Sequence, residues 1–284
     1  MNEIRLVGVL GTGTMGAGIA QVVAEAGLET ILFDPVDGAT GRALHRIRGF
    51  LERKVEKQQI GAIDAGAALA RIRPVESVEA LGAADLVVEA IPEELGLKRE
   101  AFRRLDATAA DGTILATNTS SLSVASIAAA TARPERVVGM HFFNPVPVLK
   151  LVEVVRGLET SDETVAEIVA LAEELGKVPA EARDFPGFVS NRILMPFVNE
   201  AAYALMEGVA EAEAIDTIAK LGFAHPLGPL ALADLIGLDT CVAIMDVLHE
   251  GLGDPKYAPC PLLRRYVAAG RLGRKSGRGF YEYA

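Results

Sequence analysis

Cysteine is scarce in this sequence, and its placement excludes two kinds of stabilising site. The 284 residues include two cysteines, Cys241 and Cys260, which belong to no Cys-x-x-Cys or Cys/His pattern. We therefore expect neither a disulfide framework nor a zinc site, and no bound metal. Free thiols fit a reducing compartment, and the chain runs from Met1 almost directly into a strand-like segment without a leader. A cytoplasmic protein is the expectation.

Long apolar runs and excess positive charge are also missing. No apolar run approaches the roughly 20 residues that a membrane-spanning helix needs. The formal net charge is -10, which argues against general binding to nucleic acids or anionic membranes. We expect neither kind of partner, although a local basic patch for an anionic small molecule is compatible with this total.

What the sequence does contain is a regular alternation of strand-like and helix-like segments. Strands are expected at 4–10, 30–33, 85–91, 113–117, 136–141, 149–155 and 177–182, and helices at 14–26, 39–59, 97–109, 124–130 and 161–175. This alternation is typical of an α/β protein with a parallel, doubly wound sheet.

The pattern changes at Asp184-Phe185-Pro186-Gly187. Beyond this point the periodicity predicts only helices, at 188–206, 211–221, 230–235, 238–251 and 262–269. The sequence therefore predicts a Rossmann-type domain over residues 1–185, followed by an all-α C-terminal domain over residues 186–284.

A glycine-rich turn follows the first expected strand. The segment Gly11-Thr12-Gly13-Thr14-Met15-Gly16 fits G-x-G-x-x-G, with a strand before it and a helix after it. The glycines allow a tight turn, a close approach to a pyrophosphate and close packing of the helix, whose N-terminus attracts phosphate. Asp34 ends the next strand, where a carboxylate accepts hydrogen bonds from ribose hydroxyls and repels a 2′-phosphate. The turn predicts a dinucleotide site, and Asp34 predicts NAD rather than NADP. The alternative, a plain turn and a strand cap, has weaker support.

A histidine and an acid occupy two neighbouring expected strands. His141 ends one strand, in the position where open α/β sheets bind ligands, and Glu153 is the one acid in an otherwise apolar strand. Histidine is suited to moving the proton that accompanies hydride transfer, and a carboxylate partner would orient its ring. From spacing alone, a packed core histidine with Glu153 paired elsewhere is an equally good interpretation.

At this point the sequence resembles a known family, the 3-hydroxyacyl-CoA dehydrogenases of the short-chain, single-function type. The resemblance covers nearly the whole chain in order. It rests on the strings Thr117-Asn118-Thr119-Ser120-Ser121-Leu122-Ser123, Gly139-Met140-His141-Phe142-Phe143-Asn144-Pro145-Val146-Pro147, Lys150-Leu151-Val152-Glu153-Val154-Val155, Pro186-Gly187-Phe188-Val189-Ser190-Asn191-Arg192, His225-Pro226-Leu227-Gly228-Pro229 and Gly273-Arg274-Lys275-Ser276-Gly277-Arg278-Gly279-Phe280-Tyr281.

The resemblance implies roles for particular residues. His141 would be the general acid/base on the C3 oxygen of a short (3S)-hydroxyacyl-CoA, with Glu153 as its charge partner. Ser120 and Asn191 would hold the oxygens of the substrate, and the NAD site would include Glu93, Lys98, Ser120, Asn144 and Lys275. Fatty-acid and butanoate metabolism are the implied settings. Thr12 departs from the alanine usual in the family, which we expect to leave the chemistry untouched.

One helix carries the local basic patch that a CoA ester would need. Arg42, Arg46, Arg53 and Lys57 follow one another at spacings of 4, 7 and 4, which places them on one face of the helix expected at 39–59. An ordinary solvated face explains this spacing equally well. The resemblance assigns the CoA contacts to Arg53 and Lys57.

Other interpretations of the whole chain stay open. The apolar content of the helical domain favours a homodimer, which the resemblance also implies. One rival is a β-hydroxyacid dehydrogenase that acts on a free acid, which would need a cationic carboxylate clamp and a catalytic lysine. A second rival is a catalytically silent NAD-binding homologue, against which the set Ser120, His141, Glu153 and Asn191 argues.

Overall fold

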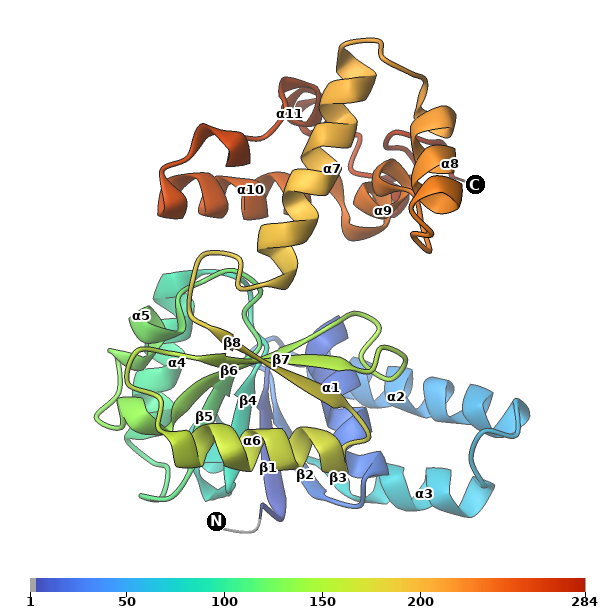
Figure 1. Ribbon diagram of the computed structural model, residues 1–284. Helices are drawn as coiled ribbons and strands as arrows, with labels where there is room; N and C mark the ends of the chain where they lie inside the picture. Colours follow the sequence, from blue (N-terminus) through green and yellow to red (C-terminus); the bar gives the residue numbers. More distant parts are fainter. Residues whose placement is uncertain (1–3, 284) are drawn as a thin grey trace. The chain divides into compact units, whose positions relative to one another are not determined.

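The computed structural model describes residues 4–283 (Figure 1). The chain divides into two compact units, 1–184 and 185–284, and each is described by itself.

The first unit is built on one eight-stranded sheet with the order β3-β2-β1-β4-β5-β6-β7-β8. Its strands are β1 (Leu6–Leu10), β2 (Glu29–Phe33), β3 (Ile72–Pro74), β4 (Leu86–Glu89), β5 (Ile114–Thr117), β6 (Val137–Phe142), β7 (Leu151–Arg156) and β8 (Val178–Arg183). Its helices are α1 (Thr14–Glu25), α2 (Ala39–Glu56), α3 (Ala62–Ala70), α4 (Leu95–Asp106), α5 (Val124–Ala128) and α6 (Asp162–Glu174). The expected α/β class with helices between strands is confirmed.

The expectation of a fully parallel sheet is wrong for one pair of strands. β6 and β7 are antiparallel, whereas every other neighbouring pair is parallel. Only residues 143–150 connect β6 to β7, and a parallel crossover needs a dozen or more residues. The reversal decides which residues of the two strands face each other.

One α-helix and one strand of the first unit were not predicted. Helix α3 has the sequence AIDAGAALA, in which alanine and glycine leave little contrast between an apolar and a polar face. Strand β3 has three residues, the last of them Pro74, and pairs only with β2. Short edge strands with proline give a weak sequence signal, and this one forms because β2 offers it a ladder.

Packing of the first unit follows the apolar patterns. β4 and β5 are buried over their whole length, as expected for central parallel strands with helices on both faces. Small and branched side chains of α1, including Ala20 and Val23, pack against the sheet with Ile47 and Leu51 of α2. This packing fixes the positions of β1 and α1, which the glycine turn connects.

The second unit is helical, as predicted. It contains α7 (Ser190–Met206), α8 (Ala212–Gly222), α9 (Pro229–Ile236), α10 (Leu238–Leu252) and α11 (Pro261–Ala268). Met195, Val198, Leu230 and Leu248 are buried in one core. In the described part of the chain, no helix combines the length and apolar character that crossing a membrane would require.

Two buried aspartates organise this unit. Asp216 accepts hydrogen bonds from the backbone N–H groups of Leu230 and Ala231, so it caps the start of α9. Asp234 accepts hydrogen bonds from the backbone N–H groups of Phe280 and Tyr281 and so fastens the C-terminal segment.

Candidate active site

The glycine turn between β1 and α1 has the geometry of a dinucleotide site. Gly11 has φ +91°, a conformation that other residues rarely adopt. A Cβ on Gly16 would lie 1.8 Å from the Gly11 carbonyl oxygen, whereas a Cβ on Gly13 would meet nothing within 4 Å. Gly13 therefore presents its backbone to open space at the N-terminus of α1, where Thr14 and Met15 begin the helix. The turn fits a pyrophosphate beside Gly13.

Asp34 is tied to the same turn. Its Oδ2 accepts hydrogen bonds from Thr12 N at 2.7 Å and from the Thr12 hydroxyl at 3.1 Å, and its Oδ1 accepts one from Val36 N at 2.9 Å. These bonds hold the carboxylate at the end of β2, where the adenosine ribose of a bound dinucleotide would lie. Thr12, the departure from the family pattern, thus bonds through its hydroxyl to the carboxylate predicted to select NAD.

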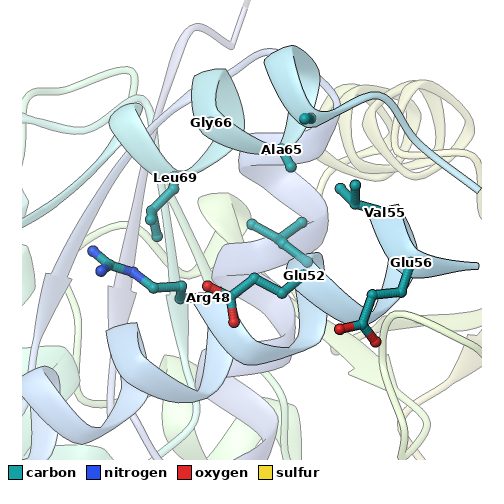
Figure 2. A pocket seen from close by; sticks show the side chains of 9 residues that line it. Arg48, Glu52, Val55, Glu56, Ala65, Gly66 and Leu69 are labelled. Carbon is teal, nitrogen blue, oxygen red and sulfur yellow. The ribbon is translucent and has the colours of Figure 1, made fainter. Parts of the chain in front are cut away.

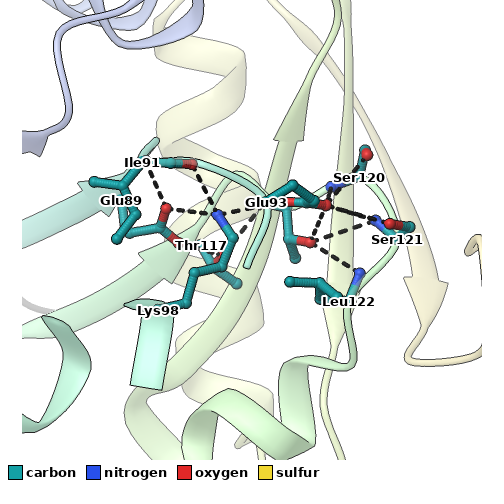
Figure 3. Close-up of polar contacts among 9 residues, drawn as sticks. Glu89, Ile91, Glu93, Lys98, Thr117, Ser120, Ser121 and Leu122 are labelled. Atoms are coloured by element: carbon teal, nitrogen blue, oxygen red, sulfur yellow. Dashed lines mark hydrogen bonds and ion pairs between the residues drawn. The ribbon is translucent and has the colours of Figure 1, made fainter. Parts of the chain in front are cut away.

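A polar network lies at the ends of β4 and β5, with Lys98 and Glu89 buried in it (Figure 3). The Lys98 ammonium, 1% exposed, lies 2.7 Å from Glu89 Oε1 and 3.2 Å from Glu93 Oε2, and it donates to the Ile91 carbonyl. Thr117 donates to the other oxygen of Glu89. Lys98 is therefore directed inward, and its contact with the predicted NAD site runs through Glu93.

Glu93 organises the loop that follows β5. Its Oε1 accepts hydrogen bonds from the Thr119 hydroxyl at 2.6 Å and from the backbone N–H of Ser120 at 2.8 Å. Burial alone would raise the pKa of Glu93, but the charge of Lys98 and these hydrogen bonds outweigh it, so the pKa is lowered. An ionised Glu93 holds the Ser120 backbone in place.

Burial has the opposite outcome for Glu89. It raises the pKa of this fully buried carboxyl, against the opposing effects of Lys98 and Thr117. The sequence prediction missed Glu89, although a lone acid ends this apolar strand just as a lone acid marks β7.

His141 and Glu153 form a buried pair across β6 and β7. The two residues are partners in the antiparallel ladder, and His141 Nδ1 lies 2.8 Å from Glu153 Oε2. Their side chains are 9% and 4% exposed. A carboxylate at Nδ1 fixes the ring orientation and stabilises the imidazolium form. The pairing that spacing left open is thus present, and the Phe143 ring lies 4.5 Å from the His141 ring.

The loop after β6 is fastened at both ends. Asn118, after β5, accepts a hydrogen bond from the Phe142 backbone N–H at 2.9 Å. The buried Lys177 donates to the carbonyl oxygens of Val146 and Leu149. Asn144 lies exposed between these anchors, next to a cis peptide bond with Pro145. Asn118 and Lys177 are supports that the sequence prediction did not identify.

Two predicted site residues belong to the second unit. Asn191 is buried in the first turn of α7. The ammonium of Lys275 lies 2.7 Å from Asp239 Oδ2, at the start of α10. Burial alone would raise the pKa of Asp239, but the hydrogen bond and charge of Lys275, together with backbone hydrogen bonds at the start of α10, outweigh it, so the pKa is lowered.

The basic stripe on α2 is exposed as the periodicity predicted. Arg42, Arg46, Arg53 and Lys57 all face solvent, whereas Ile47 and Leu51 on the opposite side are buried. The Arg53 guanidinium lies 5.4 Å from the centre of the Phe50 ring. The stripe is a cationic surface with an aromatic ring beside it.

A groove of about 540 Å³ lies elsewhere on this unit, between α2 and α3 (Figure 2). Arg48, Glu52 and Glu56 line one wall, and Ala65, Gly66 and Leu69 line the other. None of the predicted site residues lines it. The glycine turn, Asp34, Glu93, Ser120 and His141 lie instead at or just after the carboxyl ends of strands, whereas Arg53 and Lys57 lie at the C-terminal end of α2.

Comparison with known proteins agrees with this geometry. The family model described as "3-hydroxyacyl-CoA dehydrogenase, NAD binding domain" matches residues 6–185, and the one described as "3-hydroxyacyl-CoA dehydrogenase, C-terminal domain" matches residues 187–283. The chain belongs to the 3-hydroxyacyl-CoA dehydrogenase family. It is an NAD-dependent dehydrogenase, so NAD, predicted from the glycine turn and Asp34, is confirmed as the cofactor.

Similar proteins cover almost the whole chain. A protein of Bacillus subtilis named "Probable 3-hydroxybutyryl-CoA dehydrogenase" is 55% identical over 99% of this chain and 98% of its own length. The 3-hydroxybutyryl-CoA dehydrogenase of Bradyrhizobium diazoefficiens is 50% identical over 99% of this chain and 96% of its own. The crystal structure of (S)-3-hydroxybutyryl-CoA dehydrogenase from Ralstonia eutropha has a TM-score of 0.96 at 49% identity and covers 99% of this chain and 100% of that one.

Proposed function

We propose that this dehydrogenase catalyses the reversible oxidation of (3S)-3-hydroxybutyryl-CoA to acetoacetyl-CoA. The observation that carries the proposal is the buried His141–Glu153 pair, which supplies a proton carrier at the carboxyl end of the sheet. The names of the similar proteins supply the substrate class.

His141 is the proposed general acid/base. Since Nδ1 is held by Glu153, proton exchange with the C3 oxygen of the substrate is assigned to Nε2. In oxidation His141 removes the hydroxyl proton, and in reduction the protonated ring returns it. Bound NAD supplies the hydride acceptor.

Positioning of the reacting groups is assigned to Glu153, Ser120 and Asn191. Glu153 stabilises the imidazolium form. Ser120, whose backbone N–H and hydroxyl both bond to Glu93, is assigned a contact with a substrate oxygen. Family resemblance assigns a second such contact to Asn191, and NAD contacts to Asn144 and Lys275.

The CoA moiety is assigned to the basic stripe of α2. CoA carries several phosphate charges, and the exposed Arg53 and Lys57 offer cations on a protein whose net charge is -10. A free acid would not need this surface, so the stripe favours a CoA ester over the free hydroxyacid.

One assay tests the proposed reaction: oxidation of NADH, followed by absorbance, with acetoacetyl-CoA and with acetoacetate. We expect turnover of the CoA ester and a loss of kcat of about 10²- to 10⁴-fold in His141→Ala. His249→Ala, which removes a histidine of the second unit, serves as the control. Equal turnover of acetoacetate would favour the free-acid alternative, and no turnover of either compound would refute the proposed substrate.

We also propose a homodimer that forms through the second unit. Around α8, Ile218, Leu221 and Phe223 are 55%, 82% and 67% exposed, which is unusual for apolar side chains so close together. Light scattering should give twice the chain mass, and Leu221→Lys should give monomer. Leu158→Lys is a matched control, because Leu158 is also 82% exposed but lies in the first unit. A monomeric wild type would refute this proposal.

The remaining assignments concern domains and location. We propose residues 1–185 as the NAD-binding domain and residues 186–284 as the domain for substrate and dimer contacts.

Cys241 and Cys260 are both free and buried, which supports a cytoplasmic location. Cell fractionation with detection of the protein tests this location, and recovery outside the cytoplasm would contradict it.

A further inference from the structure

The buried hydroxyl of Thr12 donates a hydrogen bond to the carboxylate of Asp34, the residue predicted to select NAD. Thr12 is 2% exposed, and its hydroxyl donates to Asp34 Oδ2, which the Thr12 backbone N–H also reaches. The hydroxyl oxygen lies 3.1 Å from Oδ2, and a hydrogen bond to an ionised carboxylate is stronger than one to a neutral acceptor. Any residue at position 12 other than proline could donate its backbone N–H to Asp34, but the Thr12 hydroxyl adds a second, charge-assisted hydrogen bond.

Most of the hydrogen-bond acceptor positions of the Asp34 carboxylate are occupied by the protein itself. Each carboxylate oxygen offers about two acceptor positions. Oδ2 uses both on Thr12, and Oδ1 uses one on Val36 N. The last position on Oδ1 is left for a ribose hydroxyl, and rotation of the side chain away from the ribose would break three bonds at once.

The restraint on Asp34 matters because Arg42 brings a cation to the turn that follows this aspartate. Arg42, in the first turns of α2, donates to the Asp37 carbonyl at 3.3 Å, and a Cβ on Gly38 would lie 3.0 Å from its Nη1. An arginine close to the end of the second strand is what accommodates a 2′-phosphate in NADP-dependent Rossmann proteins. If Asp34 could turn away, this turn would offer NADP a partner for its phosphate.

We infer that Thr12 is a specificity-determining residue, which locks Asp34 in the position that accepts NAD and rejects NADP. The hydroxyl acts through Asp34, so Thr12 is a positioning residue. Its loss weakens NAD binding, because the acceptor is less well oriented, and it relieves the repulsion of NADP, because the carboxylate can move. Both changes lower the ratio of the NADPH dissociation constant to that of NADH.

The test measures this ratio by titrating the fluorescence of NADH and NADPH with the purified protein. No acyl substrate is needed, so the result is independent of the proposed reaction. We expect Thr12→Val, which keeps the shape and loses the hydroxyl, to lower the ratio about tenfold. Thr12→Ser, which keeps the hydroxyl, should stay within about twofold of wild type. Thr12→Ala replaces Thr12→Val if thermal unfolding shows that the latter is misfolded.

A double-mutant cycle separates this role from a general effect on the turn. In the Asp34→Asn background, Thr12→Val should leave the ratio unchanged, because the charge that the hydroxyl holds is gone. The inference is overturned if Thr12→Val and Thr12→Ala weaken both cofactors equally. It is likewise overturned if the tenfold effect persists in the Asp34→Asn background.

Discussion

His141 lies directly opposite Glu153 in the one antiparallel strand pair of the sheet, with Nδ1 2.8 Å from Oε2. Side chains at directly opposed positions share one face and have Cβ atoms about 4.5–5.5 Å apart. The strand pairing itself therefore places the Glu153 carboxylate next to His141, and the contact does not depend on the conformation of a loop.

This pairing predicts the behaviour of Glu153→Gln. The amide keeps the shape but no longer stabilises the imidazolium or enforces the tautomer, so kcat should fall about 10²- to 10⁴-fold, while the KM for NADH changes little. Steady-state kinetics in the reduction direction measure both constants. Glu181→Gln on β8 is the control, and a Glu153→Gln enzyme with wild-type kcat would mean that the pair is only structural.

The glycine turn predicts opposite results for two substitutions of the same kind. Gly13→Ala adds a Cβ that faces open space, so the thermal midpoint should change by only a few degrees while NADH affinity falls at least tenfold. Gly16→Ala places its Cβ 1.8 Å from the Gly11 carbonyl and should greatly reduce the yield of folded protein. Unchanged NADH affinity in Gly13→Ala would show that the cofactor does not approach this position.

The buried network predicts a pH-dependent loss of stability in Lys98→Met. Burial already raises the pKa of Glu89, and loss of the ammonium would raise it further. Because folding raises the pKa of this carboxyl, the folded protein binds the proton more tightly than the unfolded chain does. The stabilisation from this proton is present at low pH and is lost as the pH rises from the pKa of the unfolded chain through that of the folded protein. Urea unfolding should show a deficit of about 3–5 kcal/mol at pH 8 and a smaller one at pH 5.5. In Lys98→Met/Glu89→Gln this added pH dependence should disappear; its persistence there would assign the effect to another group.

The basic stripe on α2 predicts a selective effect on the CoA ester. Arg53→Ala with Lys57→Ala should raise the KM for acetoacetyl-CoA about tenfold or more and leave the KM for NADH unchanged, because two cations facing the phosphates are lost. The increase should shrink at high salt. Arg103→Ala with Arg104→Ala on α4 removes the same charge as a control. An unchanged KM in the Arg53/Lys57 variant would remove this helix from the substrate site.

Several features were determined by the sequence alone, because they depend on neighbours along the chain. The strand–glycine turn–helix unit, Asp34 at the end of the next strand, the exposed stripe of α2 and the helical second unit all follow from local periodicity and turn chemistry. Motif strings also identified the family, which residue spacing could not do.

Other features were decided only by the tertiary structure, because they depend on which distant segments meet. The reversal at β7 sets His141 against Glu153, a pairing for which spacing gave even odds. Helix α3 and strand β3 form against neighbours despite weak patterns of their own. Lys98 turns inward to Glu89, and the hydroxyl of Thr12 reaches Asp34 across 22 residues of sequence. Hydrogen bonds and ion pairs between separate strands arise from packing, so residue spacing could name candidate site residues but could not decide which of them pair.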